Sequence, residues 1–341
     1  MNNYPYQNPY PQWGPYGDPY QRLRKRERHS LWVDSNIIGG AILAMQIVSF
    51  LVGMVYSTVL LALGHFNSQG TGSIYVVDDA LMYVVFSPLS FVLCFGLFSL
   101  FTKRRVGELI SFKRPRMPQA VFLVMACFAV FAVGNWVANW TVSLLNMVGL
   151  NPALPETTSA TTPMELAVSL LMTAAVPALC EEFAFRGIVL GLLKRFGNLF
   201  AVMVSSLLFA LMHGNFVQIP FAFLVGLGLG YITVVSGSIW PAIAAHFLNN
   251  AFSCLLDYFI PDSMPMELQG LIGLAYYAFL IVVGLIGIGV LLVKKQGSFP
   301  REEAYRGCLT AGQRTGAVFS SPTILIAVLL LLFTSVTNML L

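Results

Sequence analysis

Long apolar stretches, separated by short polar segments, follow one another along most of the chain. A helix needs about 20 mainly apolar residues to cross a bilayer. Stretches of this kind predict nine spans, near 36–62, 80–102, 118–149, 164–186, 199–213, 217–235, 239–257, 268–293 and 321–341. The pattern therefore predicts an all-α protein, a polytopic transmembrane helical bundle.

Composition and charge support this interpretation and predict an orientation. Of the 341 residues 57% are hydrophobic and 10% are charged, whereas soluble domains hold about 25% charged residues. Lys and Arg cluster at 22–28, 103–116, 186–195 and 294–314. Nine spans place all four clusters on one side, which the positive-inside rule assigns to the cytoplasm. We therefore expect a multi-pass protein of the cell membrane with a cytoplasmic N-terminus.

The chain divides into four regions. Residues 1–30 combine a Tyr- and Pro-rich cytoplasmic tail, expected to be disordered, with a basic juxtamembrane run. Residues 31–163 form an N-terminal transmembrane scaffold without charges at membrane depth, and 253–341 supply further transmembrane helices. Every candidate for chemistry lies between them, in 164–252. That region is expected to hold a buried polar active site.

Two adjacent glutamates and an arginine interrupt the apolar stretch near residue 180. Ionisable groups at membrane depth are costly and usually functional. Glu182 and Arg186 are four residues apart, so they share a helix face and are expected to form an ion pair. Glu181 points about 100° away and has no sequence-local counter-charge, which suits a general base. The alternative, a purely structural ion-pair cluster, gives Glu181 no role.

Two histidines in later spans are the candidate partners of these acids. Phe209 and His213 are four residues apart, and so are His246 and Asn250. Two imidazoles and the Asn250 oxygen could hold a divalent metal, expected to be zinc, with a position left for water. Glu181 would then deprotonate that water. Asn250 could instead donate a hydrogen bond to the developing oxyanion, and His213 alone could be an interfacial residue.

The expected depths of these residues leave two alternatives. At about 1.5 Å per residue, Glu181 and His246 fall in the cytoplasmic half of the bilayer, whereas His213 lies deeper if its helix begins near Leu199. Either that helix begins already sunk in the protein, or residues 187–198 form a re-entrant or interfacial helix.

A glycine pattern indicates close helix packing rather than nucleotide binding. Gly226, Gly228 and Gly230 lie in an apolar stretch, and small residues let helices approach closely. No strand–turn–helix context surrounds them, as a nucleotide loop would require. No nucleic-acid partner is expected.

Three motifs in this order resemble those of the CPBP family, the CAAX-protease and bacteriocin-processing intramembrane metalloproteases. Glu-Glu-x-x-x-Arg occupies 181–186, Phe-x-x-x-His occupies 209–213 and His-x-x-x-Asn occupies 246–250. The resemblance covers about residues 164–252.

The resemblance implies an intramembrane, metal-dependent endopeptidase that cleaves membrane-associated proteins or peptides. It implies that Glu181 activates the water and that Glu182 and Arg186 support the site. It places the remaining site residues around the metal or the oxyanion: His213, His246 and Asn250.

Two other classes of function compete with this interpretation. A non-catalytic membrane scaffold or bacteriocin-immunity protein would retain the fold, but it needs no unpaired intramembrane acid. A proton-coupled transporter would also use membrane carboxylates and histidines, but it favours inverted repeats, and here the polar residues occupy one block. The substrate and the oligomeric state stay open.

Overall fold

The computed structural model describes seven parts of the chain: 20–62, 89–102, 105–150, 152, 160–261, 263–299 and 307–340. Within these parts every regular element is a helix, which confirms the all-α prediction. The Tyr- and Pro-rich tail, apart from Tyr20, lies outside them. The residues at 22–28 form the first turns of α1.

The described helices follow one another in chain order. They are α1 (Gln21–Ala62), η1 (Leu89–Leu93), α3 (Cys94–Leu100), α4 (Val106–Leu109), α5 (Met117–Met147), α6 (Pro163–Ser169), η2 (Leu170–Ala175), α7 (Val176–Glu182), η3 (Phe183–Val189), α8 (Leu190–Leu193), η4 (Lys194–Phe196), α9 (Asn198–Leu211), α10 (Gln218–Ser236), α11 (Trp240–Phe259), α12 (Met266–Val293), α13 (Ala311–Phe319) and α14 (Pro322–Leu340).

Six helical stretches in the described parts are long and apolar enough to cross a membrane. They are Gln21–Val59, Met117–Met147, Pro163–Phe196, Gln218–Ser236, Met266–Val293 and Pro322–Met339. The protein is thus a helical membrane bundle, but the predicted count of nine spans is not confirmed.

The difference in count has identifiable causes. The predicted span 80–102 is described only from Leu89 onward. Helix α9, which was predicted as the span 199–213, has 14 residues, too few to span alone. Helix α11 has 20 residues but carries His246, Asn250 and Asp257 among its apolar side chains, and it is not among the six.

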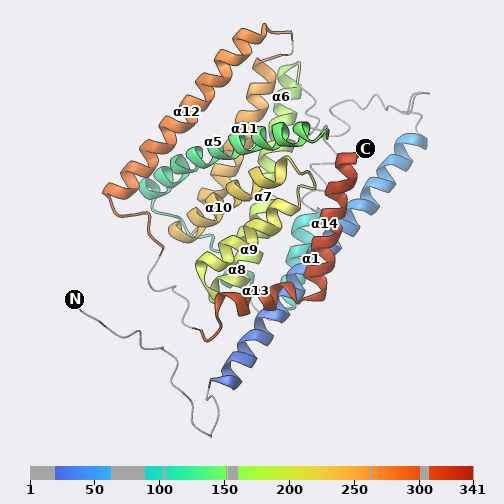
Figure 1. The fold of residues 1–341 in the computed structure, drawn as a ribbon, viewed down its shortest axis with the longest axis vertical. Coiled ribbons are helices and arrows are strands. Elements are labelled where there is room, and N and C mark those ends of the chain that lie inside the picture. Colours follow the sequence, from blue (N-terminus) through green and yellow to red (C-terminus); the bar gives the residue numbers. More distant parts are fainter. Residues whose placement is uncertain are drawn as a thin grey trace.

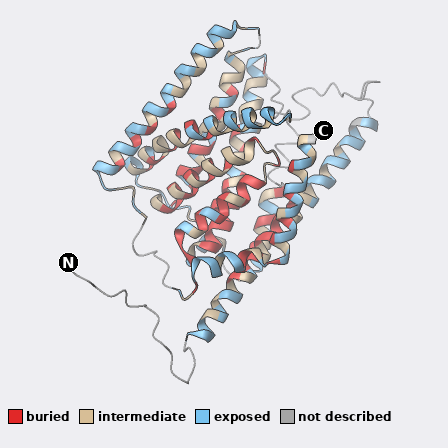
Figure 2. Cartoon of the chain, viewed as in Figure 1, coloured by how far each residue is buried: buried red, intermediate tan, exposed pale blue. Residues whose placement is uncertain are grey.

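The central helices form the buried part of the bundle. Figure 1 shows α7, α8, α9 and α10 in the middle, with α5 and α12 on one side and α1 beside α14 on the other. Figure 2 shows that buried residues gather in these central helices, whereas α12 and the C-terminal end of α1 are largely exposed. The region predicted to hold the site therefore lies inside the bundle.

The glycines of α10 allow the close packing predicted for them. A Cβ atom added at Gly226 or Gly230 would lie 3.0 Å from side-chain carbon atoms of α9. One added at Gly228 would lie 3.3 Å from Val130 of α5. Glycines 226 and 230 thus face one neighbour, and Gly228 faces another.

One continuous helical path carries both glutamates. It runs from Pro163 to Phe196 and contains two π-helical segments, η2 and η3, which flank α7 on either side. Gly197, with φ of 114°, ends the path, and α9 begins at once with the buried Asn198. Residues 187–196 continue the glutamate helix, so the structure supports the alternative in which α9 begins inside the protein.

Candidate active site

The predicted ion pair between Glu182 and Arg186 is present and is sealed inside the bundle. Arg186 Nη1 lies 3.2 Å from Glu182 Oε1, and both side chains are completely buried. Arg186 Nη2 also donates to the carbonyl oxygen of Gly226, at 3.4 Å. Because a buried charge is tolerated only with partners, this pairing explains how both charges can lie at membrane depth.

His246 lies between the two glutamates and contacts both. Its Nδ1 atom is 2.9 Å from Glu182 Oε1, and its Nε2 atom is 3.9 Å from Glu181 Oε2. One oxygen of Glu182 therefore serves both Arg186 and His246. The sequence indicated His246 as a candidate partner of the acids, but it did not specify Glu182, which lies 64 positions away on another helix.

The two glutamates differ in accessibility, as their angular separation predicted. The side chain of Glu181 is 20% exposed, whereas that of Glu182 is completely buried. Adjacent residues on a helix point about 100° apart, so α7 turns one carboxylate inward and the other toward the outside of the bundle. Of the two, only Glu181 is open to the surroundings of the bundle.

The ring of Phe209 contacts three other side chains of the site. Its ring lies 4.2 Å from the guanidinium carbon of Arg186, close enough for a cation–π interaction. The ring centroids of His213 and His246 lie 4.9 Å and 5.9 Å from that of Phe209. The sequence indicated Phe209 only through its spacing from His213, and the structure gives its aromatic ring three polar neighbours.

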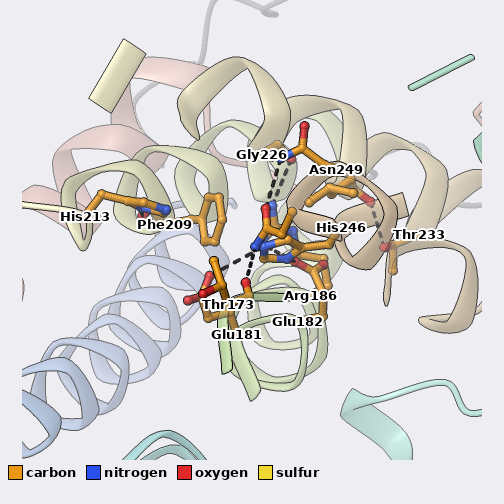
Figure 3. A network of polar contacts seen from close by, with 12 residues as sticks. Thr173, Glu181, Glu182, Arg186, Phe209, His213, Gly226, Thr233, His246 and Asn249 are labelled. Atoms are coloured by element: carbon orange, nitrogen blue, oxygen red, sulfur yellow. Dashed lines mark hydrogen bonds and ion pairs between the residues drawn. The ribbon is translucent and has the colours of Figure 1, made fainter. Parts of the chain in front are cut away.

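His213 is separated from the other polar residues by this ring. Figure 3 shows Phe209 between His213 on one side and the cluster of Glu181, Arg186 and His246 on the other. The Nδ1 atom of His213 lies 3.0 Å from the carbonyl oxygen of Phe209 in its own helix. The structure thus brings together Glu181, Glu182, Arg186 and His246, four of the six predicted site residues. His213 lies on the other side of the Phe209 ring.

Asn250 occupies the outer side of the site and is held by two residues that the sequence did not indicate. Its Nδ2 atom donates to the carbonyl oxygen of Thr173 at 2.9 Å. Its Oδ1 atom accepts from Asn249 Nδ2 at 3.0 Å. One sequence signal for the first contact was available, because Pro177 has no N–H to offer to the carbonyl four residues earlier.

The predicted metal ligands do not converge on one point in this structure. Among the described residues, no three His, Cys, Asp or Glu side chains are placed to hold a metal ion. The two imidazoles flank Phe209, and Asn250 Oδ1 already accepts a hydrogen bond. The arrangement does not fit a shared coordination sphere, so metal binding stays a prediction and no step below depends on it.

Comparison with known proteins identifies the central region. Residues 163–252 match the family described as Type II CAAX prenyl endopeptidase Rce1-like. The match includes all six predicted site residues and confirms the resemblance to the CPBP family over this segment. No curated protein matches the chain, and no solved structure does. The family match supports a protease, and the apolar helices support a multi-pass membrane protein.

Proposed function

On the premise that residues 163–252 are similar to Rce1-like endopeptidases, we propose that the protein is an intramembrane endopeptidase. Its substrates are membrane-associated proteins or peptides, cleaved by a water molecule that Glu181 activates. One observation carries the proposal. His246 contacts both glutamates, yet only Glu181 is exposed, so a fixed imidazole lies behind a reachable carboxylate.

The first step is proton removal from water by Glu181. A positioned carboxylate can act as a general base and later return the proton to the leaving amine. The oxygen of the water bonds to the scissile carbonyl carbon, and the carbon–nitrogen bond then breaks. Because Glu181 has the only exposed carboxylate of the pair, the reacting water belongs on its side of the site.

His246 lies beside that carboxylate and can accept a hydrogen bond from Glu181 once Glu181 has taken up a proton. A neutral imidazole that donates from Nδ1 to Glu182 has its lone pair on Nε2, which faces Glu181. Glu182 in turn is fixed by Arg186, and Arg186 is fixed by the Gly226 carbonyl and the Phe209 ring. A buried chain of contacts thus lies behind one partly exposed acid.

Asn250 is the candidate donor to the negatively charged carbonyl oxygen of the intermediate. Its nitrogen has two hydrogens, and one of them goes to Thr173. Preorganised donors of this kind stabilise the oxyanion in acyl-transfer reactions. The second hydrogen of the amide is available for this role.

A separate proposal is dependence on a divalent metal, expected to be zinc, with His213 and His246 as candidate ligands; Asn250 would be either a third ligand or the oxyanion donor, and its orientation in this structure fits the donor. When bound, such a metal would acidify the attacking water. Cleavage should stop when a membrane-permeant chelator is added to isolated membranes and should return with added zinc. Cleavage that proceeds unchanged under chelation would remove the metal from the proposal and leave Glu181 as the sole activator.

Expression of the wild type and of Glu181→Gln at equal levels tests the function. New termini of membrane proteins or peptides, quantified by mass spectrometry of membranes, should appear only with the wild type. Glu267→Gln is the matched control, because Glu267 is an exposed carboxylate in the first turn of α12. Identical termini for all three forms would contradict the proposal and favour the membrane scaffold.

The same proposal places the protein in the lipid bilayer of the cell membrane with its N-terminus in the cytoplasm. The basic residues at 22–28, 105–116, 194–195 and 294–295 support this orientation. Protease accessibility of a tag at the N-terminus, in intact cells and in inverted vesicles, would test it.

A further inference from the structure

The helix that carries the two glutamates presents a carbonyl group outside its own hydrogen-bond ladder. In an α-helix the carbonyl of residue 173 accepts from the N–H of residue 177. Residue 177 is proline and has no N–H. The π-helical segment η2 lies at this point, between Leu170 and Ala175. Thr173 lies in this segment, and its carbonyl accepts from another helix.

Asn250 of α11 supplies the donor. Its Nδ2 atom lies 2.9 Å from the Thr173 carbonyl oxygen. A carbonyl can only accept, so the nitrogen of this amide must face Thr173 and its oxygen must face away. The two helical segments meet again one turn away, four residues after Asn250 and four residues before Thr173. There Cys254 Sγ lies 3.9 Å from the carbonyl oxygen of Ser169. The glutamate helix is therefore anchored to α11 at two points, one in η2 and one at the end of α6.

Asn249 completes the orientation of that amide. Its Nδ2 atom donates to Asn250 Oδ1 at 3.0 Å, which gives the oxygen a partner in the only orientation that Thr173 permits. Both asparagines are half-buried and Thr173 is exposed, so the amide lies at the accessible side of the site.

We propose that Asn249 and Pro177 are positioning residues, which together fix the Asn250 amide with its nitrogen as a donor for the reaction. The inference rests on the proposed endopeptidase function. Pro177 leaves the Thr173 carbonyl open as the acceptor for the nitrogen, and Asn249 occupies the oxygen. In this orientation Asn250 donates to the intermediate, and its oxygen is not available to a metal.

Substitution of Asn249 by aspartate and by alanine tests the first part. The aspartate is isosteric but offers an acceptor where Asn250 Oδ1 needs a donor, whereas alanine only removes the donor. Loss of an oxyanion donor costs about 100- to 1,000-fold in kcat, so a displaced donor should cost roughly 10- to 100-fold in Asn249→Asp. Asn249→Ala should lose less than Asn249→Asp, and KM should change little in both.

The assay follows cleavage of the membrane-protein terminus that distinguishes wild type from Glu181→Gln. Asn139→Asp is the matched control. Asn139 donates to the hydroxyl of Tyr277, a residue of α12 outside the site, at 3.0 Å. Its kcat should equal that of the wild type. A kcat for Asn249→Asp equal to that of the control would overturn the role of Asn249.

Pro177→Ala tests the second part through a split between stability and turnover. The substitution restores an N–H to the helix, which should raise the midpoint of thermal unfolding. The same N–H competes with Asn250 for the Thr173 carbonyl, so kcat should fall. A residue with only a structural role would move both quantities in the same direction. A higher unfolding midpoint with unchanged kcat would overturn the role of Pro177.

Thermal unfolding also separates this inference from the proposed function. The unfolding midpoints should decrease in the order wild type, Asn249→Ala, Asn249→Asp, because aspartate places two acceptors against each other. This order is measurable even if the wild type cleaves nothing, an outcome that would refute the endopeptidase alone. An unfolding midpoint of Asn249→Asp at or above that of Asn249→Ala would overturn the positioning of the amide.

Discussion

The site has two halves of contrasting character. The closed half, consisting of Glu182, Arg186 and Phe209, is buried, and its charges contact each other. The open half, consisting of Glu181, Thr173 and Asn250, is partly exposed and meets the closed half through His246. The contrast teaches that paired charges can fix the positions of side chains inside the bundle. The proposed hydrolysis, in turn, needs an acid that water can reach.

The same substitution at the two neighbouring glutamates is the strongest test of this comparison. Glu181→Gln should lower the cleavage rate by about 100- to 10,000-fold, the usual contribution of a general base, with little change in thermal stability. Glu182→Gln should lower the unfolding midpoint, because it weakens contacts to both Arg186 and His246. Rates and unfolding midpoints of the purified variants measure both effects. Equal loss of stability in the two variants would erase the distinction between the halves.

Removal of the cation from the closed half should have the next largest effect. Arg186→Ala leaves the buried Glu182 without its guanidinium partner, and breaking a buried pair costs roughly 3–5 kcal/mol. The yield of folded protein in membranes and the unfolding midpoint in detergent should both fall. Arg116→Ala is the control, since Arg116 is exposed and precedes α5, away from the site. Wild-type stability of Arg186→Ala would contradict the pairing.

The smallest effect is expected at Phe209, whose ring lies between His213 and the two halves of the site. Phe209→Leu keeps an apolar side chain but removes the ring that lies over the Arg186 guanidinium. A cation–π contact contributes about 0.5–2 kcal/mol, so stability should fall by that order. Phe200→Leu, which removes the ring beneath Arg314, is the matched control for stability. A rate loss in Phe209→Leu but not in Phe200→Leu would assign the ring a part in orienting the imidazoles.

Local spacing predicted those features of the site that one helix determines. The pairing of Glu182 with Arg186 and the separate direction of Glu181 follow from the helical period, and the structure has both. The contact between Glu182 and His246 depends on how α7 and α11 are rotated about their axes. No periodicity within one segment specifies that rotation, so the sequence indicated the histidines as candidate partners of the acids but not which histidine contacts which glutamate.

The fold shows the same limit. Hydropathy predicted the helical membrane bundle, and the glycines of α10 predicted its close packing. Hydropathy did not show that the glutamate helix continues to Phe196, because an apolar stretch with two basic residues near its end reads equally well as a separate interfacial segment. Gly197, where φ is 114°, is the local feature that ends this helix.

The shared oxygen of Glu182 has a further consequence in terms of net charge. The cluster holds two carboxylates and one guanidinium, so with a neutral His246 its formal charge is −2 + 1 = −1. A proton that Glu181 takes from water brings this sum to zero. In the proposed mechanism the cluster would thus be formally neutral while it holds the proton, between its removal from water and its delivery to the leaving amine.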